Sequence, residues 1–419
     1  MELMEETPKR ALAVIGGGPI GIEAALRGIS LDFDVHVYER GSIGENIRRW
    51  GHVRMFSPWK MNRSSLGKRM LEEHGKRIRG KEDVCPTGDE YVRNYLLPLS
   101  RLPLLKKRLH TGMEVLSIGR ETIGKNELIG NPKRAQHKFR LLMRNAKGKE
   151  SVPLFDIVID ATGVYGNNNW MGNGGIPAIG EQVLHGEITY TIPDILGTDK
   201  HIYEGTRTLL VGSGHSAATS LVQFSRFIKE SPESSLVWVT RSENEQPYEI
   251  FSDDALPLRS ELGEKANVIA ANPPRNISFL PGCTVESISK RGKVFSVVVK
   301  QGDRKRTIKA ENIIANVGYG PDNKIYRELQ VHECWASRAP FKLAAALLGE
   351  SSADCLTQKS HGADTLKNPE PNFFIIGNKS YGKNSAFLIR TGLEQIKEVY
   401  SLIPRTLEIK AGQFLYPAR

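Results

Sequence analysis

The sequence predicts an α/β protein with two Rossmann-like folds. The first observation is a strand–glycine–helix–strand pattern close to the N-terminus, at residues 11–39. The second is a copy of that pattern at 208–241, and the third is a set of further apolar runs with strand character at 112–118, 137–143 and 156–160. Because the two copies lie so far apart, they indicate two separate folds rather than a tandem repeat within one.

The first pattern begins with the apolar run 11–15, which ends in Gly16-Gly17-Gly18-Pro19-Ile20-Gly21. Apolar residues then recur at 22, 25, 26 and 29, which is the spacing of a helix that buries one face. A second short strand follows and ends at Glu39. These features predict a βαβ unit with a glycine-rich turn after its first strand.

Each glycine of the Gly16-x-Gly18-x-x-Gly21 motif has a physical role in dinucleotide binding. The first allows a tight turn, the second lets the backbone approach a pyrophosphate, and the third packs helix against strand. The helix N-terminus offers unpaired N–H groups to phosphate. Glu39 lies 18 residues after Gly21, where a carboxylate can accept hydrogen bonds from ribose hydroxyls. The alternative, a plain glycine turn, explains neither the placement nor the acid.

The second pattern carries a relaxed form of the same motif. The run 208–211 leads into Gly212-Ser213-Gly214-His215-Ser216-Ala217, in which alanine replaces the third glycine. The next strand, at 236–240, ends at Arg241 rather than at an acid, and a guanidinium suits a 2′-phosphate. Arg241 therefore favours NADPH over NADH, with a solvated strand-end charge as the alternative. We interpret His215 as a structural or phosphate-facing residue rather than a catalytic base.

The remaining chain offers weaker patterns. A strand at 156–160 ends in Ala161-Thr162-Gly163, and another ends at a glycine within 313–318. Alternation at 284–289 and 293–300 predicts antiparallel strands. The segment 243–275 is expected to be loop-rich and 347–372 to be a polar surface excursion. A final helix is expected to start at a capping box formed by Thr391 and Glu394.

Composition excludes several classes of protein. The formal net charge is +11 on 419 residues, which raises nucleic acid as a partner, but the Lys/Arg cluster at 68–81 lacks interleaved aromatic residues. We interpret that cluster as a solvated helical face and expect no nucleic-acid partner. No apolar run approaches the roughly 18 residues of a membrane span, and no secretory signal is visible. Four cysteines without a C-x-x-C pair argue against a dithiol centre or a zinc site, and favour a reducing, cytoplasmic setting.

The order of these motifs, together with Gly377-Asn378 near the C-terminus, resembles that of two-domain flavoproteins that carry FAD and a nicotinamide dinucleotide. Within these, it more specifically resembles the flavin-containing (class B) monooxygenases. The resemblance implies that the first glycine loop holds FAD and the second holds NADPH. It further implies an FAD-binding domain at 1–170 and 311–419, with the NADPH-binding domain, 171–310, inserted into it.

The resemblance also implies roles for single residues. Trp50 matches the family's Gly…Trp stretch, Gly377-Asn378 matches a Gly-Asp pair that contacts the flavin ribityl chain, and the helix at Thr391 would point at the flavin. Arg40 and Arg241 would contribute charge to the cofactor sites. Asn62 is the candidate catalytic residue, with capping of the following helix as its alternative. The family fingerprint is matched imperfectly by Gly180, His185 and Tyr190.

By this resemblance the protein would be an FAD-dependent, NADPH-consuming monooxygenase. It would transfer one oxygen atom of O2 to a small organic substrate through a flavin C4a-(hydro)peroxide. Two alternatives remain open at this point. One is an NAD(P)H-dependent reductase or dehydrogenase that passes electrons to another acceptor, and the other is a non-catalytic flavin-binding partner protein.

Overall fold

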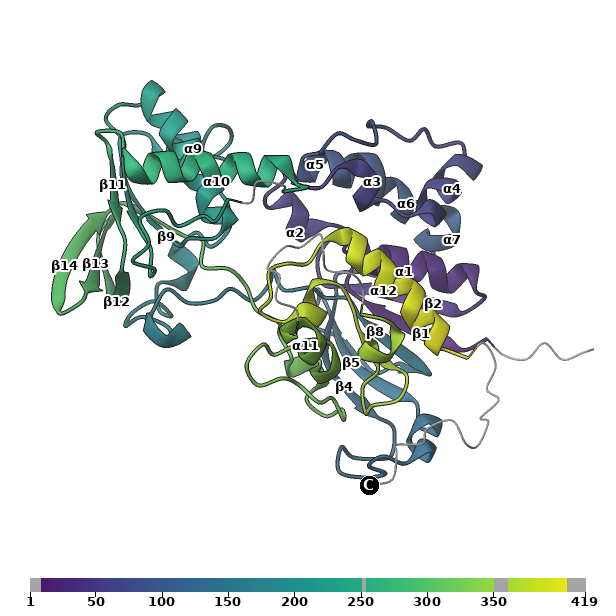
Figure 1. Cartoon of the computed structure of the whole chain (residues 1–419). Helices are drawn as coiled ribbons and strands as arrows, with labels where there is room; N and C mark the ends of the chain where they lie inside the picture. The colour runs from purple at the N-terminus through teal and green to yellow at the C-terminus, as the bar shows by residue number, and fades with distance from the viewer. Residues whose placement is uncertain (1–8, 251–253, 350–360, 405–419) are drawn as a thin grey trace, which may run out of the picture. The chain divides into compact units, whose positions relative to one another are not determined.

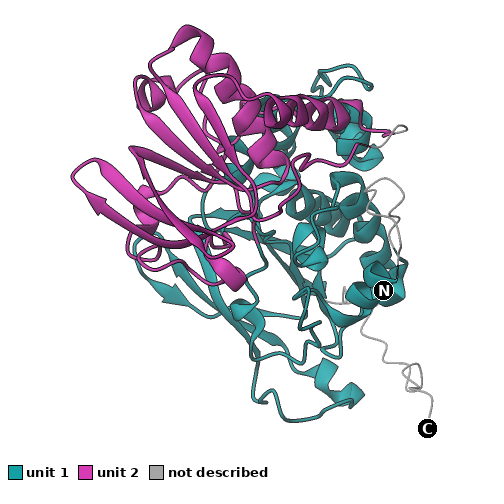
Figure 2. Ribbon diagram, turned by 60° about the vertical axis from the view of Figure 1, so that its left-hand side comes forward, with its two compact units in different colours: residues 1–48, 57–166, 320–419 teal, residues 49–56, 167–319 magenta. Residues whose placement is uncertain are grey.

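The computed structural model describes residues 9–250, 254–349 and 361–404 (Figure 1). The chain divides into two compact units, which we describe separately (Figure 2). The first unit takes residues from 1–48, 57–166 and 320–419, and the second takes 49–56 and 167–319. The second unit therefore interrupts the first in sequence.

The observed boundaries differ from the predicted division at 170 and 310. Strand β15 (Asn312–Ala315) belongs to the second unit because it pairs in parallel with β9 (Arg207–Val211), with Ile313 opposite Leu209. The segment 49–56, which contains Trp50, also belongs to the second unit rather than to the first. Pairing between distant strands sets these limits, and such pairing leaves no local signal in sequence.

A five-stranded parallel sheet organises the described part of the first unit, with the strand order β16-β8-β1-β2-β3. Its central strand β1 pairs with β2 on one side and with β8 on the other. The carboxyl ends of these strands, and so the loops that follow them, lie at one edge of the sheet. The strands are β1 (Ala11–Ile15), β2 (Asp34–Glu39), β3 (Leu109–Thr111), β8 (Ile157–Asp160) and β16 (Phe373–Ile375).

Two further groups of elements complete the first unit. An antiparallel sheet packs on one face of the parallel sheet through a shared apolar cluster. Its strands are β4 (Met113–Arg120), β5 (Phe139–Asn145), β6 (Glu150–Ser151) and β7 (Leu154–Phe155). The α-helices are α1 (Pro19–Ser30), α2 (Glu45–Arg48), α3 (Trp59–Asn62), α4 (Ser65–Glu73), α5 (Gly88–Tyr91), α6 (Leu97–Ser100), α7 (Pro103–Lys106), α11 (Phe341–Leu348) and α12 (Ile389–Leu402). A π-helical turn, Val92–Leu96, lies between α5 and α6.

The second unit has three layers. A parallel sheet of order β11-β10-β9-β15 lies between helices on one face and the antiparallel sheet β12-β13-β14 on the other. The remaining strands are β10 (Ser235–Val239), β11 (Ile277–Leu280), β12 (Cys283–Arg291), β13 (Val294–Gln301) and β14 (Arg304–Ala310). The α-helices are α8 (Lys200–Tyr203), α9 (His215–Glu230) and α10 (Pro257–Ala271).

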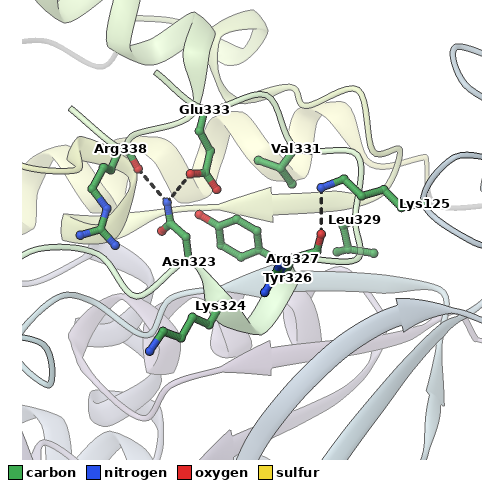
Figure 3. A pocket seen from close by; sticks show the side chains of 9 residues that line it. All are labelled: Lys125, Asn323, Lys324, Tyr326, Arg327, Leu329, Val331, Glu333 and Arg338. Carbon is green, nitrogen blue, oxygen red and sulfur yellow. Dashed lines mark hydrogen bonds between the residues drawn. The ribbon is translucent and has the colours of Figure 1, made fainter. Parts of the chain in front are cut away.

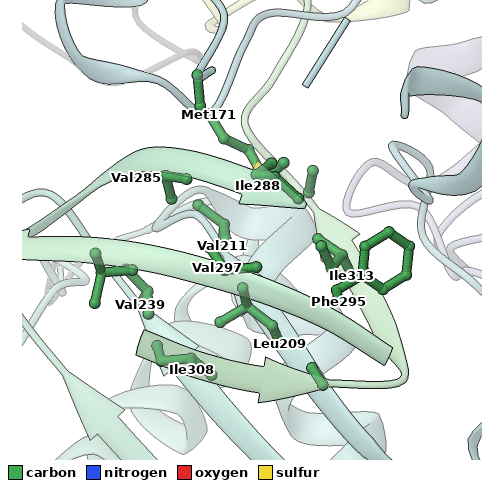
Figure 4. Close-up of a cluster of buried hydrophobic side chains, with 14 of the residues drawn as sticks. Met171, Leu209, Val211, Val239, Val285, Ile288, Phe295, Val297, Ile308 and Ile313 are labelled. Atoms are coloured by element: carbon green, nitrogen blue, oxygen red, sulfur yellow. The ribbon is translucent and has the colours of Figure 1, made fainter. Parts of the chain in front are cut away.

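Strand β9 shows how one sequence fills two apolar cores. Leu209 and Val211 face the cluster shared with β12, β13 and β14, which Figure 4 shows from close by. Leu210, whose side chain points to the opposite face, joins the cluster with α9 and α10. Because both faces are covered, β9 reads as a continuous apolar run, as expected for a buried parallel strand.

Three local predictions were wrong. The predicted loop-rich segment 243–275 contains α10, and the start of the last helix is Ile389, so Thr391 lies inside its first turn. The N-cap of this helix is Leu388, which makes no side-chain cap hydrogen bond, so the capping box with Glu394 does not form. The basic cluster 68–81 is helical only as far as Glu73.

The predicted surface excursion at 347–372 also needs correction at its C-terminal end. Residues 350–360 lie outside the described part of the chain, but Glu370 is buried. Its carboxylate forms ion pairs with Arg120 and Arg134, whose side chains are also buried. No helix among the described residues has the length and apolarity needed to cross a membrane.

Candidate functional site

The steric surroundings of the first glycine loop fit the three roles that the sequence predicts. Gly16 has a φ of +108°, and a Cβ on it would lie 2.6 Å from the carbonyl oxygen of Ala161. A Cβ on Gly21 would lie 1.9 Å from the carbonyl oxygen of Gly16, so α1 packs directly on the end of β1. A Cβ on Gly18, by contrast, would meet nothing within 4 Å. The backbone of Gly18 is therefore open to a ligand.

The first turn of α1 provides hydrogen-bond donors at this opening. Gly18 is the N-cap, and no side chain forms a cap hydrogen bond there. Pro19 occupies the first helical position and lacks an N–H. The N–H groups of the first turn have no partner within the helix, and the helix dipole is positive here. Ile20 is buried in this turn. The arrangement suits a phosphate or pyrophosphate group.

Glu39 forms hydrogen bonds with the backbone of the first glycine loop and of Gly41. One carboxylate oxygen accepts a hydrogen bond from the Gly17 backbone N–H at 2.6 Å, and the other accepts one from Gly41 at 2.7 Å. Each oxygen keeps further lone pairs that can accept from a ribose hydroxyl. Arg40 follows on the surface and lies 3.8 Å from the carboxylate of Glu114.

The end of β8 carries a buried ion pair that sequence reasoning missed. Lys379 Nζ lies 2.6 Å from Asp160 Oδ2, and both side chains are at most 1% exposed. The backbone N–H and hydroxyl of Thr162 donate to Asp160 Oδ1 at 3.1 and 2.7 Å. Gly163 follows with a φ of +68°, in the left-handed region. The pair therefore joins the predicted Ala161–Gly163 loop to the segment after Gly377.

Helices α1 and α12 pack side by side and run in the same direction (Figure 1). A Cβ on Gly392 would lie 2.4 Å from Ile20 Cδ1. Eight residues further along each helix, a Cβ on Gly28 would lie 2.5 Å from the hydroxyl of Tyr400, which donates to Ala24 O. The earlier residues of the two helices contact each other, and so do the later ones. The helices are therefore parallel, and both N-termini lie at the same end. Two positive dipole ends therefore face the same region.

The loop after β16 is fixed against α12. Gly377, with a φ of +74°, donates its backbone N–H to Gln395 Oε1 at 2.8 Å. The amide of Gln395 in turn donates to Ser380 Oγ at 2.9 Å. Asn378 is only half-buried beside this network, and the buried hydroxyl of Thr391 has no hydrogen-bond partner within the described residues. A polar ligand at the start of α12 would satisfy that hydroxyl.

Asn62, the predicted catalytic residue, is entirely buried. Its Oδ1 accepts from Ser57 Oγ at 2.9 Å, and its Nδ2 donates to the carbonyl oxygens of Ser57 and Pro58. These bonds commit the amide to the turn before α3. The alternative, capping of the next helix, is wrong, because Ser64 caps α4 through a hydrogen bond from Gly67.

The second glycine loop repeats the geometry of the first within its own unit. Gly212 has a φ of +135°, and a Cβ on it would lie 2.2 Å from the carbonyl oxygen of Asn316. Gly214 is exposed and a Cβ on it would meet nothing within 4 Å, while Ala217 is buried where α9 packs on the sheet. Asn316 thus corresponds in position to Ala161 of the first loop.

Aromatic donors orient this second loop. The indole of Trp238 donates to the carbonyl oxygen of Gly212 at 2.8 Å, and the hydroxyl of Tyr248 donates to that of Gly214 at 3.2 Å. The N–H groups at the start of α9 have no acceptor within the helix and remain for a ligand. His215 and Ser216 open that helix, and the His215 ring meets the ring of Phe56, with centroids 5.5 Å apart.

Arg241 lies at the same sheet edge as the second glycine loop. It follows the end of β10, where Val239 pairs with Val211, the residue directly before Gly212. Arg241 is exposed and makes no ion pair with any described residue. Its charge is thus available to a ligand in this loop. Trp50 lies in the segment 49–56 of the same unit, so its predicted contact with FAD stays a prediction.

The residues of the imperfect monooxygenase fingerprint do cluster. The His185 ring stacks on Tyr190 with centroids 4.8 Å apart, and its Nε2 lies 2.9 Å from Asn168 Oδ1. Tyr190 donates its hydroxyl to Glu181, a fully buried carboxylate that also accepts from the backbone of Met171. Burial, together with the Glu181 charge, raises the pKa of Tyr190. This cluster shapes the loop 168–190.

No protein-family model matches this chain, and no curated protein matches it either. Solved structures do match over nearly its whole length. The bacillithiol disulfide reductase of Bacillus cereus is 17% identical, with 94% of this chain and 98% of that chain covered and a TM-score of 0.67.

Two oxygen-transferring enzymes, a monooxygenase and a hydroxylase, match in the same way. The FAD-bound cadaverine monooxygenase of Erwinia amylovora is 12% identical, covers 99% of this chain and 100% of its own, and has a TM-score of 0.62. The ornithine N-hydroxylase of Kutzneria sp. 744, with FAD, NADP+ and L-ornithine, is 12% identical, with 94% and 98% covered and a TM-score of 0.62. The chain therefore shares the α/β fold of these oxidoreductases, with two Rossmann-like units.

Proposed function

We propose that the first unit binds FAD. The observation that carries the proposal is the open backbone of Gly18 at the N-terminus of α1, beside the parallel helix α12. The pyrophosphate would lie at Gly18, the ribose at Glu39, and the flavin near Asn378 and Thr391. The residues present fit such a cofactor, because the N–H groups of α1 and the unpaired Thr391 hydroxyl are donors that it would satisfy.

We also infer that the second unit binds NADPH. Gly214 offers the same open backbone at the start of α9, and Arg241 lies where a 2′-phosphate would need a cation. His215 and Ser216 would border the phosphates. The structure of the Kutzneria enzyme with NADP+ supports this choice, because it has the same fold.

The reaction that these sites support best is the oxidation of NADPH by a flavin-dependent oxidoreductase. FAD, when bound, would supply two-electron redox chemistry, while the protein binds, orients and excludes water. The positive ends of α1 and α12 would stabilise anionic groups of the cofactor. The Asp160–Lys379 pair would hold the Thr162 loop in place, and the bonds of Gln395 would fix Gly377.

For the final acceptor we propose O2, with one oxygen atom transferred to a small organic molecule. The shared fold of the cadaverine and ornithine hydroxylases supports this choice, and an amine is the first substrate class to test. The second candidate is electron transfer to another acceptor without oxygenation. It is supported by the fold shared with the disulfide reductase of Bacillus cereus, whose TM-score is 0.67.

Cofactor binding is tested with Gly18→Ala and Gly214→Ala. Neither added Cβ meets another atom, so each variant should unfold close to the wild type. Gly18→Ala should lose at least about tenfold in FAD affinity, since a methyl group would lie where the pyrophosphate approaches. Gly214→Ala should keep FAD and lose NADPH affinity. FAD binding unchanged in Gly18→Ala would contradict the first assignment.

Nucleotide preference is tested with Arg241→Gln, and Arg275→Gln serves as the control because Arg275 is another exposed arginine of the same unit. The ratio of kcat/KM for NADPH to that for NADH should fall in Arg241→Gln alone. An unchanged ratio would show that Arg241 is a solvated charge.

The acceptor is tested by following NADPH, O2 and hydrogen peroxide together in the FAD-loaded protein. If an amine is the substrate, it should accelerate NADPH oxidation and lower peroxide release, and isotopically labelled O2 should label the product. NADPH oxidation that depends on an added quinone or disulfide, and not on O2, would favour the second candidate. A protein that binds FAD but shows no NADPH oxidation with any acceptor would be a flavin-binding partner instead.

A further inference from the structure

Strand β14 forms one edge of the antiparallel sheet β12-β13-β14 in the second unit (Figure 1). It pairs with β13 from Arg304, which lies opposite Gln301, to Ala310, which lies opposite Phe295. In an antiparallel pair, the N–H and C=O groups of alternate residues point toward the partner strand, and those of the other residues point away. No described residue forms a hydrogen bond with the outward groups of β14. This edge is therefore open to a further strand.

The side chains of β14 are strongly cationic. Four of its seven residues carry a positive charge and none carries a negative one; the four are Arg304, Lys305, Arg306 and Lys309. All four are exposed, and none forms an ion pair with a residue that the structure describes. A lysine on an edge strand discourages pairing with the edge of another sheet, and one such residue is enough for that purpose. Four cations on one short edge call for a further reason.

These cations lie on both faces of the sheet. Because successive side chains of a strand alternate, Lys305 and Lys309 point to one face and Arg304 and Arg306 point to the other. Ile308 shares the face of the two arginines and is buried in the apolar cluster that Figure 4 shows. A strand added beside β14 would therefore meet cations above and below its own plane.

A further cation lies next to the strand. Lys300 of β13 is directly opposite Lys305, so their Cβ atoms are about 5 Å apart and both side chains point to the same face. Like charges directly opposite each other destabilise a sheet. Neither ammonium group has an anionic partner among the described residues. A carboxylate placed beside this pair would reduce the repulsion.

The cavity of about 400 Å³ in the first unit provides a contrast (Figure 3). Its wall also carries cations, but polar groups of the wall bond to one another. Lys125 Nζ donates to the carbonyl oxygen of Arg327 at 2.8 Å, and Asn323 Nδ2 donates to Glu333 Oε2 at 2.7 Å. The cations of β14 have no such partners among the described residues, and they remain available to another molecule.

We propose that β14 binds an extended acidic segment of a partner protein. The backbone of the segment would pair with the open edge and add a fourth strand to the sheet. Its carboxylates would lie beside Arg304, Lys305, Arg306 and Lys309. The cofactor loops proposed above do not include β14, so the inference goes beyond the proposed function.

Other occupants fit these observations less well. A second copy of this chain, pairing edge to edge, would place the cations of one β14 against those of the other. A nucleic acid would neutralise the cations but would leave the outward N–H and C=O groups of the strand without a strand partner. In addition, β14 contains no aromatic side chain on which a base could stack.

The test uses a peptide of sequence Thr-Glu-Val-Thr-Glu-Glu-Glu. In an antiparallel register its glutamates face the four cations of β14, and its valine faces Ile308. Two further peptides carry N-methyl groups on the odd or on the even residues. All three have the same charge, but only one of the two sets of N–H groups faces β14 in a strand pair.

Binding to the full chain is measured by the fluorescence anisotropy of labelled peptides at constant ionic strength. One methylated peptide should bind at least about tenfold more weakly than the unmodified one, because it loses its hydrogen bonds to the edge. The other should stay within about threefold. Equal affinities of the two methylated peptides would overturn strand addition, and failure of the unmodified peptide to bind would overturn the site.

Matched variants test the role of charge. Lys305→Gln with Lys309→Gln removes two cations from β14, and Lys229→Gln with Arg275→Gln removes two exposed cations of the same unit that lie outside this sheet. Affinity for the unmodified peptide should fall by at least about fivefold in the first pair and stay within about twofold in the second. Equal losses would mean that the peptide responds to overall charge, and would overturn the site.

Two competing polyanions are measured with the same proteins. These are a single-stranded oligonucleotide with the same number of charges as the peptide, and vesicles that contain phosphatidylglycerol. Both should bind more weakly than the unmodified peptide at the same ionic strength, because neither can pair with the backbone of β14. Tighter binding of either one, lost in Lys305→Gln with Lys309→Gln, would overturn the assignment of this edge to an acidic segment.

Discussion

The buried pair of Asp160 and Lys379 joins two of the predicted cofactor loops of the first unit. Both side chains are at most 1% exposed, and their nitrogen and oxygen lie 2.6 Å apart. Removing one partner leaves the other charge buried without compensation. Asp160→Asn and Lys379→Met should each lower the free energy of unfolding by about 3–5 kcal/mol, as measured by urea denaturation.

The double variant separates pairing from burial. Because Asp160→Asn with Lys379→Met leaves no buried charge, it should be less destabilised than the sum of the single variants, with a coupling of at least about 1 kcal/mol. Additive losses would contradict an energetic link between the two residues. FAD affinity measured in the same variants would then report on the position of Thr162, which donates twice to Asp160.

Glu23 gives the first unit a pH-dependent stability. It is buried on α1 and accepts hydrogen bonds from Ser64 and Tyr95, but desolvation dominates and raises the pKa of Glu23 above its ordinary value of 4.5. Between that value and the raised pKa, the folded state keeps a proton that the unfolded state releases. Stability should therefore fall as the pH rises through this window.

Glu23→Gln removes the titrating group while keeping the size of the side chain. In urea denaturation from pH 4.5 to 8, the free energy of unfolding of the variant should depend less on pH than that of the wild type. The stability of the variant relative to the wild type should therefore be greatest at the alkaline end. Glu90→Gln would be unsuitable as a control because Glu90 completes the capping box of α5. Glu398→Gln, on α12, leaves the buried group intact and should keep the wild-type slope.

At the scale of elements, the strand–glycine–helix patterns could be predicted because each carries a local signal. Apolar strands, left-handed glycines and a helical period all lie within 11–30 and again within 208–228. Helix α10 was missed because its buried stripe consists of Arg259, Gly263, Ala266 and Ala270. The spacing is helical, but small residues and an arginine give no apolar period.

The candidate site divides in the same way. The position of Glu39 beside the first glycine loop could be predicted because both belong to one βαβ pattern within residues 11–39, and its bond to the Gly17 N–H fits that position. The position of Lys379 could not, because its bond to Asp160 spans 219 positions, and a lysine between an asparagine and a serine gives no sign of burial. The same holds for Asn316, which meets Gly212 only because β15 pairs with β9. Contacts set by strand order are invisible to local patterns.

The Glu370 triad ties the segment before β16 to the antiparallel sheet. Its carboxylate pairs with Arg120 on β4 and with Arg134, and it also accepts from the backbone of Gln330 at 2.7 Å. Glu370→Gln replaces the carboxylate with an amide. The two buried guanidinium groups then lose one of its two acceptor oxygens and its negative charge. The substitution should lower the free energy of unfolding by about 3–5 kcal/mol in thermal or urea denaturation.

An exposed pair provides the comparison. Lys60 and Asp83 are 2.7 Å apart, but their side chains are 58% and 82% exposed. Asp83→Asn makes the same carboxylate-to-amide change as Glu370→Gln. It should leave the free energy of unfolding unchanged within error, since water screens the pair. A Glu370→Gln variant as stable as Asp83→Asn would show that the arginines find other acceptors.

At the scale of the whole molecule, the net charge of +11 is not concentrated in the glycine loops. Arg241 is exposed at the second loop, whereas Arg40 already has Glu114 beside it. The glycine loops therefore account for only a small part of the net charge.

The division into two units leads to a last prediction, which rests on the proposed function. A ligand that binds one folded unit stabilises that unit by about 2.7 kcal/mol at a hundred times its Kd. In hydrogen exchange, FAD should therefore slow exchange in β1, α1 and α12, which belong to the first unit, and NADPH should do so in β9 and α9 of the second. Gly18→Ala should lose only the first effect and Gly214→Ala only the second. Protection of α1 by NADPH in the absence of FAD would reverse the assignment of the two glycine loops, and equal protection of both units by either nucleotide would show that one cofactor stabilises the chain as a single cooperative body.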